Sequence, residues 1–174
     1  MKTKLILILS LAFLIAGCQS QVDSGSKSPN IILIMCDDLG WGDVGFNGNK
    51  IIQTPNLDML AGKGITFNRF YSASAVCSPT RGSCLTGRNP YRYGIWTANA
   101  GHMKKEEITL PELLKEKGYS TGHFGKWHLG TLTTKIKDAN RGKPGDSTHY
   151  SIPAMHGYDN YLVTESKIPT YDPM

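Results

Sequence analysis

A short apolar run near the N-terminus constrains the fold of this chain most strongly. Residues 30–35 read Asn-Ile-Ile-Leu-Ile-Met, and two aspartates follow them directly. A near-continuous apolar run of this length, rich in isoleucine, is typical of a β-strand buried on both faces, as in parallel sheets covered by helices. We therefore expect an α/β protein in which this run is a buried strand.

The segments that follow alternate between helical and extended patterns. Residues 55–64 predict a helix that ends at a glycine, and residues 65–71 and 119–124 predict two further strands. Residues 109–118 predict another helix, with Thr109 as its N-cap, a proline just inside and a glycine at its end. Strands that alternate with helices indicate an α/β sandwich around a mostly parallel sheet. The polar, basic stretch 131–153 predicts a long surface loop.

The first 28 residues predict export rather than part of the fold. Residues 1–18 contain two lysines, an apolar run at 5–15 and small residues before Cys18, which is the pattern of a cleaved signal peptide. The apolar run is shorter than a membrane-spanning helix requires. The end of this segment resembles a bacterial lipobox, which implies that Cys18 is lipidated and becomes the mature N-terminus. Residues 19–28 are polar and predict a flexible tether.

Composition narrows the classes of partner and of structural site. The formal charge is +5, from 19 basic and 14 acidic residues, which suits either an anionic substrate or an ordinary solvated surface. No tract of Lys and Arg with interleaved aromatic residues is present, which argues against nucleic-acid binding. The four cysteines form no C-x-x-C pair, so neither a disulfide scaffold nor a structural zinc site is indicated. A single Cys36–Cys84 bridge stays open as an alternative.

The segment 77–88 holds the strongest chemical signal. It begins Cys-Ser-Pro-Thr-Arg and ends Leu-Thr-Gly-Arg. Pro79 suits the first turn of a helix, which places Cys77 at or near the N-cap, where free N–H groups and the helix dipole favour an anion. Arg81 lies one helical turn after Cys77, and its planar fork can bind a carboxylate or an oxygen held by residue 77. The alternative is an ordinary buried thiol at a capped helix start.

Two further pairs of residues have the chemistry of an active site. Asp37 and Asp38 follow the apolar run, at the strand end where open α/β sheets bind ligands, and two adjacent carboxylates call for a cation between them. Taken alone, such a pair is also compatible with a solvated turn. Lys126 and His128 are two residues apart, so an extended backbone would point both side chains into one pocket.

Taken together, the three motifs between residues 29 and 130 resemble those of the type I, formylglycine-dependent sulfatases of the alkaline-phosphatase superfamily. The resemblance implies a three-layer α/β sandwich with a mostly parallel sheet, here incomplete. It also implies that a maturation enzyme oxidises Cys77 to formylglycine. Thr80 replaces the serine common at that position and keeps its hydroxyl.

The resemblance also implies roles for the other residues. Asp37, Asp38 and the modified Cys77 would bind a divalent metal, calcium in preference to magnesium. Cys77, as formylglycine, would be the nucleophile. The catalytic residues Arg81, Lys126 and His128 would contact it and the sulfate. The family draws further metal ligands from a region well beyond Lys126, so residues 29–174 are interpreted as the truncated N-terminal part of a catalytic domain, inactive by itself.

The expected function is hydrolysis of sulfate esters, on a sulfated carbohydrate or an aryl sulfate. Residues 91–93, Trp96 and Trp127 offer aromatic faces for sugar rings, or serve only in packing. A phosphate or phosphonate ester hydrolase, and a catalytically inactive lipoprotein that binds sulfated glycans, are the alternatives. The expected location is the bacterial cell envelope, lipid-anchored in the periplasm or on the outer-membrane surface, the latter favoured by Gln19 after the lipidated cysteine.

Overall fold

The computed structural model describes residues 28–137 and 141–166. The predicted signal peptide with Cys18, and the tether apart from Ser28, lie outside the described residues. The chain divides into two parts, Met1–Cys36 and Asp37–Met174, which are described separately.

The described residues of the first part contain no helix or strand, so the predicted strand at 30–35 is wrong for this structure. The five apolar side chains from Ile31 to Met35 are between 38% and 84% exposed. The composition of this run does favour an extended strand. A strand, however, also needs a hydrogen-bonded neighbour, and the described sheet does not include this run.

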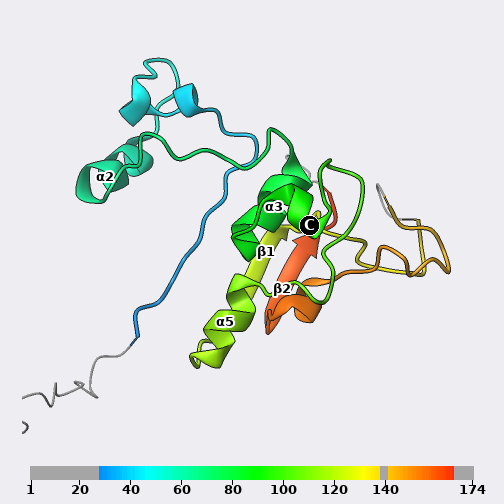
Figure 1. Cartoon of the computed structure of the whole chain (residues 1–174). Coiled ribbons are helices and arrows are strands. Elements are labelled where there is room, and N and C mark those ends of the chain that lie inside the picture. The colour runs from blue at the N-terminus through cyan, green and yellow to red at the C-terminus, as the bar shows by residue number, and fades with distance from the viewer. Residues whose placement is uncertain (1–27, 138–140, 167–174) are drawn as a thin grey trace, which may run out of the picture. The chain divides into compact units, whose positions relative to one another are not determined.

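The second part contains short helices and two strands (Figure 1). The 3₁₀ helices are η1 (Trp41–Asp43), η2 (Gly45–Asn47) and η3 (Pro153–His156). The α-helices are α2 (Pro55–Lys63), α3 (Cys77–Thr86), α4 (Pro90–Tyr93) and α5 (Leu110–Glu116), and the strands are β1 (Gly122–Lys126) and β2 (Asn160–Thr164). None of the helices in the described residues has the length and apolar character needed to cross a membrane.

Helices α2 and α5 confirm the predictions from their capping residues. Helix α2 begins at its proline, and the N–H of Gly64 bonds to the carbonyl of Leu60 at its end. At α5 the Glu112 carboxylate accepts hydrogen bonds of 2.8 Å from both the N–H and the hydroxyl of Thr109. Thr109 and Glu112 form a capping box, which satisfies donors that the first turn of a helix otherwise leaves unpaired.

The two strands pair in parallel, with Gly122 opposite Asn160 and Lys126 opposite Thr164. Strand β1 starts three residues later than predicted, because the N–H of Thr121 bonds to the Asp159 carboxylate at 2.9 Å instead of joining a ladder. Strand β2 was not predicted. The predicted strand at 65–71 is not formed, and its apolar side chains are exposed. As with the run at 31–35, the described sheet does not include this segment.

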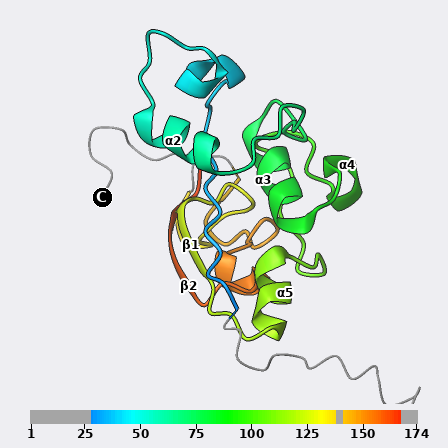
Figure 2. The same cartoon turned by 90° about the vertical axis from the view of Figure 1, so that its left-hand side faces the viewer.

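The core of this part lies between the strand pair and its helices. Figure 2 shows α3 and α5 on the same side of β1 and β2. The buried cluster comprises Leu85, Tyr93, Ile95, Met103, Trp127 and Leu129. At its centre the Tyr93 hydroxyl donates to the carbonyl of Pro79, and a Cβ on Gly82 would lie 2.7 Å from the Tyr93 ring. Glycine therefore lets α3 approach the core closely at this position.

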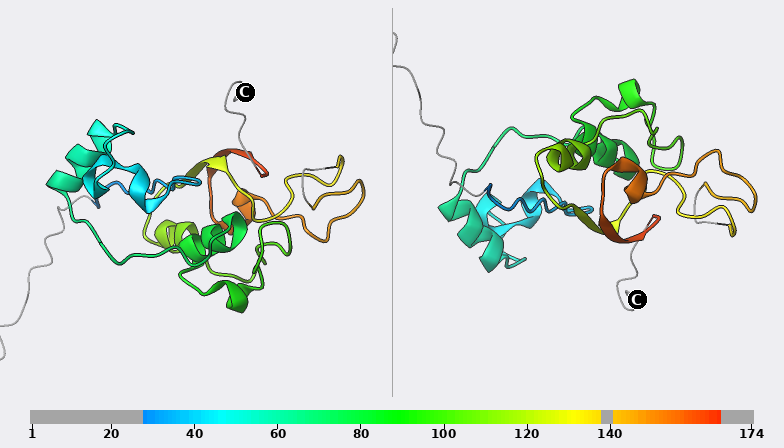
Figure 3. Two further views of the ribbon diagram at one scale, coloured as in Figure 1. Left: turned by 90° about the horizontal axis from the view of Figure 1, so that it is seen from above. Right: turned by 90° about the horizontal axis from the view of Figure 1, so that it is seen from below.

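The described residues of the segment 131–153 are only partly a surface loop. Figure 3 shows it extending beyond the strands. Lys143, Pro144 and Gly145 are exposed, but Thr131, Arg141 and Ser151 are buried, with Arg141 only 7% exposed. Backbone pairing of Thr131 with residues 149–151 fastens the base of the loop. The predicted surface loop is therefore wrong at its base and at Arg141.

Candidate active site

Helix α3 places Cys77 at its first position, as the proline predicted. Val76 is the N-cap, in an extended conformation, and Gly87 ends the helix with φ +66°. The hydroxyl of Thr80 donates to the carbonyl of Ser74 at 2.7 Å, which fixes the approach to the helix. Cys77 is half-buried and, like Cys36 and Cys84, is a free thiol. The first turn of α3 therefore presents residue 77 together with free backbone N–H groups.

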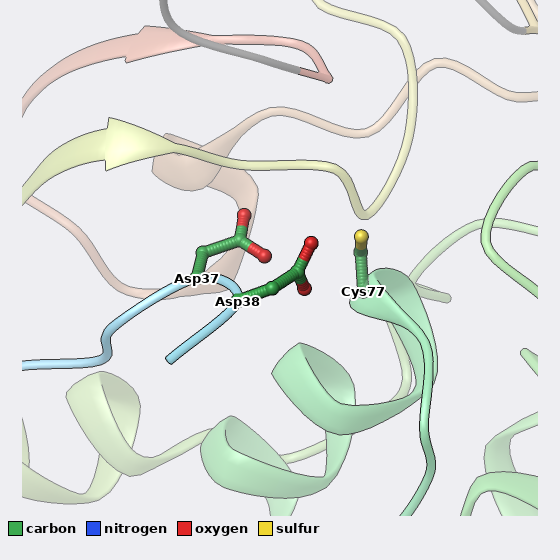
Figure 4. A group of neighbouring side chains, drawn as sticks. All are labelled: Asp37, Asp38 and Cys77. Carbon is green, nitrogen blue, oxygen red and sulfur yellow. The ribbon is translucent and has the colours of Figure 1, made fainter. Parts of the chain in front are cut away.

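Two carboxylates lie beside this thiol. One ligand atom from each of Asp37, Asp38 and Cys77 lies within 4.8 Å of the others, a grouping that can hold a metal ion. Figure 4 shows the side chains of Asp37 and Asp38 next to that of Cys77, which lies at the start of α3. The peptide bond that joins the two aspartates is cis. The structure thus brings Cys77 together with two predicted site residues that lie 39 and 40 positions earlier in the sequence.

Two cations complete the cluster through Asp37. Its Oδ2 atom accepts from Arg81 Nη2 at 3.0 Å and from Lys126 Nζ at 2.7 Å. The other terminal nitrogen of Arg81 donates to the carbonyl of Lys126 at 2.7 Å. Arg81 therefore connects α3 both to the end of β1 and to the Asp37 carboxylate. Binding a carboxylate is the first of the two roles that its planar fork suggested.

The charges around Asp37 keep it ionised. Partial burial favours the neutral acid, but hydrogen bonds from Lys126 and with Asp38, together with the charges of Lys126 and Arg81, lower its pKa to about 2. A carboxylate that stays charged near neutral pH can bind a cation without first losing a proton.

His128 reaches the site by a different backbone route from the one predicted. Strand β1 ends at Lys126, and His128 lies beyond it with φ +55°, in the left-handed region, so the extended backbone predicted through His128 is not present. Its ring Nε2 lies 3.1 Å from Asn99 Oδ1. Burial and then the positive charges of Arg141, Lys126 and Arg81 lower its pKa to about 4. His128 is therefore a neutral imidazole near pH 7, within electrostatic range of the other site residues.

Two residues that contact the site were not predicted from the sequence. Asn99 contacts the His128 ring, and Arg141 bonds to Ser78 beside the thiol and to the backbone of His128. Both lie in segments without a recognisable motif. Their contacts span 13 to 63 residues of sequence, so no local signal could have identified them.

The two carboxylates present fit a hard divalent cation, and an oxygen donor at residue 77 would fit it better than a thiol. Asp37 and Asp38 supply carboxylate oxygens, which calcium and magnesium prefer. A thiolate is a soft donor and suits neither ion, whereas the hydroxyl of a hydrated formylglycine is a hard oxygen donor. This cluster supplies part of the six to eight oxygens that calcium takes.

We predict that the protein loses stability as the pH falls from 7 to 5. Four histidines have pKa values lowered first of all by burial: His102, His123, His128 and His156. Because their folded pKa values lie below the unfolded value of about 6.5, the unfolded chain binds more protons in this window. Each can contribute up to about 1.4 kcal/mol per pH unit.

Urea unfolding at several pH values would measure this slope. His128→Gln should make the slope shallower, while Lys63→Gln, on the exposed surface of α2, should leave it unchanged. The lowered pKa of Asp37 acts only below about pH 4, so it does not contribute in this window. A free energy of unfolding that is flat or rises on acidification would contradict the prediction.

Comparisons with known proteins agree with this arrangement. The sulfatase family model matches residues 29–166. The chain is 45% identical to the N-acetylgalactosamine-6-sulfatase of Mus musculus over 139 residues, 73% of this chain and 26% of the relative. It is 36% identical to arylsulfatase D of Homo sapiens over 170 residues, 92% of this chain and 27% of the relative. The chain thus spans about a quarter of the length of these curated relatives.

Solved structures show the same relationship. Ps i-CgsB in complex with k-i-k-neocarrahexaose matches with a TM-score of 0.64 and 37% identity, over 79% of this chain and 28% of that one. A structure from work on the metabolism of multiple glycosaminoglycans by Bacteroides thetaiotaomicron matches with a TM-score of 0.65 and 36% identity, over the same shares. The fold is therefore an incomplete α/β fold of the alkaline-phosphatase type. With the family model matching most of its length, the chain belongs to the sulfatase family.

Proposed function

We propose that the whole protein hydrolyses sulfate esters, with residue 77 as formylglycine acting as the nucleophile. The observation that supports this most directly is the cluster at the start of α3. Asp37, Asp38 and Cys77 present their ligand atoms within 4.8 Å of one another, and Arg81 and Lys126 both bond to Asp37. The family match and the named relatives favour sulfate esters over phosphate esters.

The chemistry explains why a plain thiol or hydroxyl would not suffice at residue 77. A hydrated aldehyde bears two hydroxyls on one carbon. One attacks sulfur and displaces the alcohol, and the other then loses its proton as the C–O bond to sulfate breaks and the aldehyde re-forms. His128 is neutral near pH 7 and can accept that proton. Arg81 and Lys126 offset negative charge on the transferring group.

Asp37 and Asp38, with an oxygen of modified residue 77, would hold a calcium ion. When bound, such an ion polarises the sulfate and stabilises negative charge on the nucleophile. The two carboxylates would orient these groups, and Lys126 would keep Asp37 ionised and in place.

We further propose a sulfated carbohydrate as the substrate. Relatives of this chain include an N-acetylgalactosamine-6-sulfatase and a protein solved with a neocarrahexaose. Tyr91 and Trp96 are 77% and 61% exposed, with ring centroids 6.5 Å apart, and can stack on sugar rings. Trp127 cannot take this role, because it is fully buried in the core.

Two measurements on the whole protein test the proposal. After expression with a formylglycine-generating enzyme, mass spectrometry of the peptide 70–81 should show residue 77 as the aldehyde. Turnover should then be compared among defined sulfated oligosaccharides, an aryl sulfate and an aryl phosphate. If residue 77 were found only as the unmodified thiol, the proposed mechanism would be wrong. Turnover of the aryl sulfate alone would refute the carbohydrate substrate, and preference for the phosphate would refute the reaction.

We also propose that Cys18 anchors the protein by lipid to the bacterial cell envelope, in the periplasm or on the outer-membrane surface. The support is the segment around Cys18, which resembles a lipobox. Cell fractionation tests it. Wild-type protein should be found with the membranes and Cys18→Ser should not, and an unchanged distribution would refute the anchor.

A further inference from the structure

Arg141 is the most deeply buried cation in the described residues, and the sulfatase mechanism leaves it without a role. It is 7% exposed, and no carboxylate in the part of the chain described here lies within ion-pair distance of it. Burial lowers its pKa to about 10, so it remains charged near neutral pH. A buried, unpaired charge costs free energy, which makes a role in stability alone a poor explanation.

The hydrogen bonds of Arg141 join the segments that bear the reactive groups. Its Nη2 atom donates to the hydroxyl of Ser78 at 3.0 Å, in the first turn of α3 beside Cys77. The same atom donates to the carbonyl of Ala98 at 2.9 Å and, over a longer 3.5 Å, to the carbonyl of His128. The Ser78 hydroxyl also donates to Ala98, at 2.5 Å.

His128 needs such support because its backbone is strained. A non-glycine residue at φ +55° occupies the left-handed region, which is unfavourable for L-residues and persists only where neighbours hold it. The N–H of His128 donates to the carbonyl of Glu165 at 2.6 Å on one side. Arg141 binds its carbonyl on the other side. The ring is held by Asn99, the neighbour of the Ala98 carbonyl that Arg141 also binds.

We infer that Arg141 is a positioning residue for His128, which it fixes relative to residue 77 through the His128 backbone and through the Ala98–Asn99 segment. This inference rests on the proposed function for its catalytic consequence. Its structural content, that one side chain fastens the first turn of α3, residues 98–99 and His128, does not depend on the reaction.

The test uses Arg141→Met in the whole matured protein. We expect kcat for a sulfate ester to fall on the order of a hundredfold, as a misplaced catalytic group implies, with KM and formylglycine content changed by less than about threefold. Arg141→Lys should recover part of the loss, because its ammonium can still reach the carbonyls. Lys63→Met, at an exposed lysine of α2, is the control and should be indistinguishable from wild type.

A double-mutant cycle with His128→Ala distinguishes positioning from a general structural role. If Arg141 acts through His128, adding Arg141→Met to His128→Ala should reduce kcat further by less than about threefold. Additive losses would overturn the inference. Should Arg141→Met fail to fold, Asn99→Ala serves instead. Asn99 is exposed and contacts the His128 ring directly, so the same non-additivity is expected.

Hydrogen exchange separates this inference from the proposed function. In Arg141→Met, peptides that cover residues 98–101 and 127–131 should exchange faster, while α5 should be unchanged. Unaltered exchange in both peptides would overturn the inference, whatever the activity. A wild-type protein that turns over no sulfate ester would refute the proposed function, and the exchange data would still decide whether Arg141 fastens these segments.

Discussion

Cys77→Ala is expected to lower kcat for a sulfate ester by roughly 10⁴-fold or more, the scale of losing a covalent nucleophile. Its side chain is half-buried at the start of α3, so alanine should change the free energy of unfolding by no more than about 1 kcal/mol. Steady-state assays together with urea unfolding would measure both. Turnover near that of wild type would remove residue 77 from the mechanism.

Two companion variants sharpen this result. Cys77→Ser places one hydroxyl where the mechanism needs two, so it should release at most one equivalent of alcohol and keep the sulfate as an ester visible by mass spectrometry. Cys84→Ala is the matched control. Cys84 lies in the same helix, and burial raises the pKa of its thiol, so it should be chemically inert and its loss should leave kcat unchanged. Repeated turnover by Cys77→Ser would argue against the hydrated aldehyde.

Asp37→Asn is expected to have the second largest effect. The change keeps the size of the side chain but removes the charge that Arg81 and Lys126 share at 3.0 Å and 2.7 Å. Calcium affinity should fall by at least about a hundredfold, and kcat by roughly 10²- to 10³-fold, because the neutral amide neither attracts the ion nor holds the two cations. Elemental analysis of bound metal and assays over a calcium titration would check this.

Asp58→Asn provides the control for this change. The Asp58 carboxylate bonds to the N–H of Phe46 at 2.8 Å and to the Thr54 hydroxyl at 2.9 Å, outside the cluster at α3. It should affect stability but neither metal content nor kcat. If Asp37→Asn retained full metal content and turnover, Asp37 would be neither a metal ligand nor an organiser of the cations.

Helix ends could be predicted well from the sequence because their signals are local. The Thr109 and Glu112 capping pair, the proline at the start of α2 and the proline in the first turn of α3 each act within four residues. The same locality explains why Cys77 was placed correctly at the start of its helix.

Strands were predicted less well because their partners lie elsewhere in the chain. The runs at 30–35 and 65–71 have strong strand-forming composition, yet neither has a hydrogen-bonded neighbour in the described residues. Strand β2 was overlooked although Tyr-Leu-Val-Thr at 161–164 has suitable residues, since the run is short and follows a polar segment.

In the candidate site, too, the features with a local sequence signal were predicted and those that depend on distant parts of the chain were not. Its motif residues Asp37, Arg81 and Lys126 were identified from the sequence, and the structure joins them directly. The route of the backbone to His128 was not predicted, because a positive φ at a histidine has no sequence signal here. Arg141 was assigned to a solvated loop, and only the fold shows that it bonds to Ser78, 63 residues away.

The burial of the first turn of α3 sets an order of events for the proposed modification. Ser78 and Pro79, which directly follow Cys77, are each less than 2% exposed, and the Pro79 carbonyl accepts a hydrogen bond from the core residue Tyr93. A maturation enzyme that must bind this stretch of chain needs access to it before α3 packs against the core. Conversion of Cys77 would then compete kinetically with folding, and a molecule that folded first would keep a thiol for its lifetime. Slower folding variants of this domain should accordingly contain a larger fraction of aldehyde.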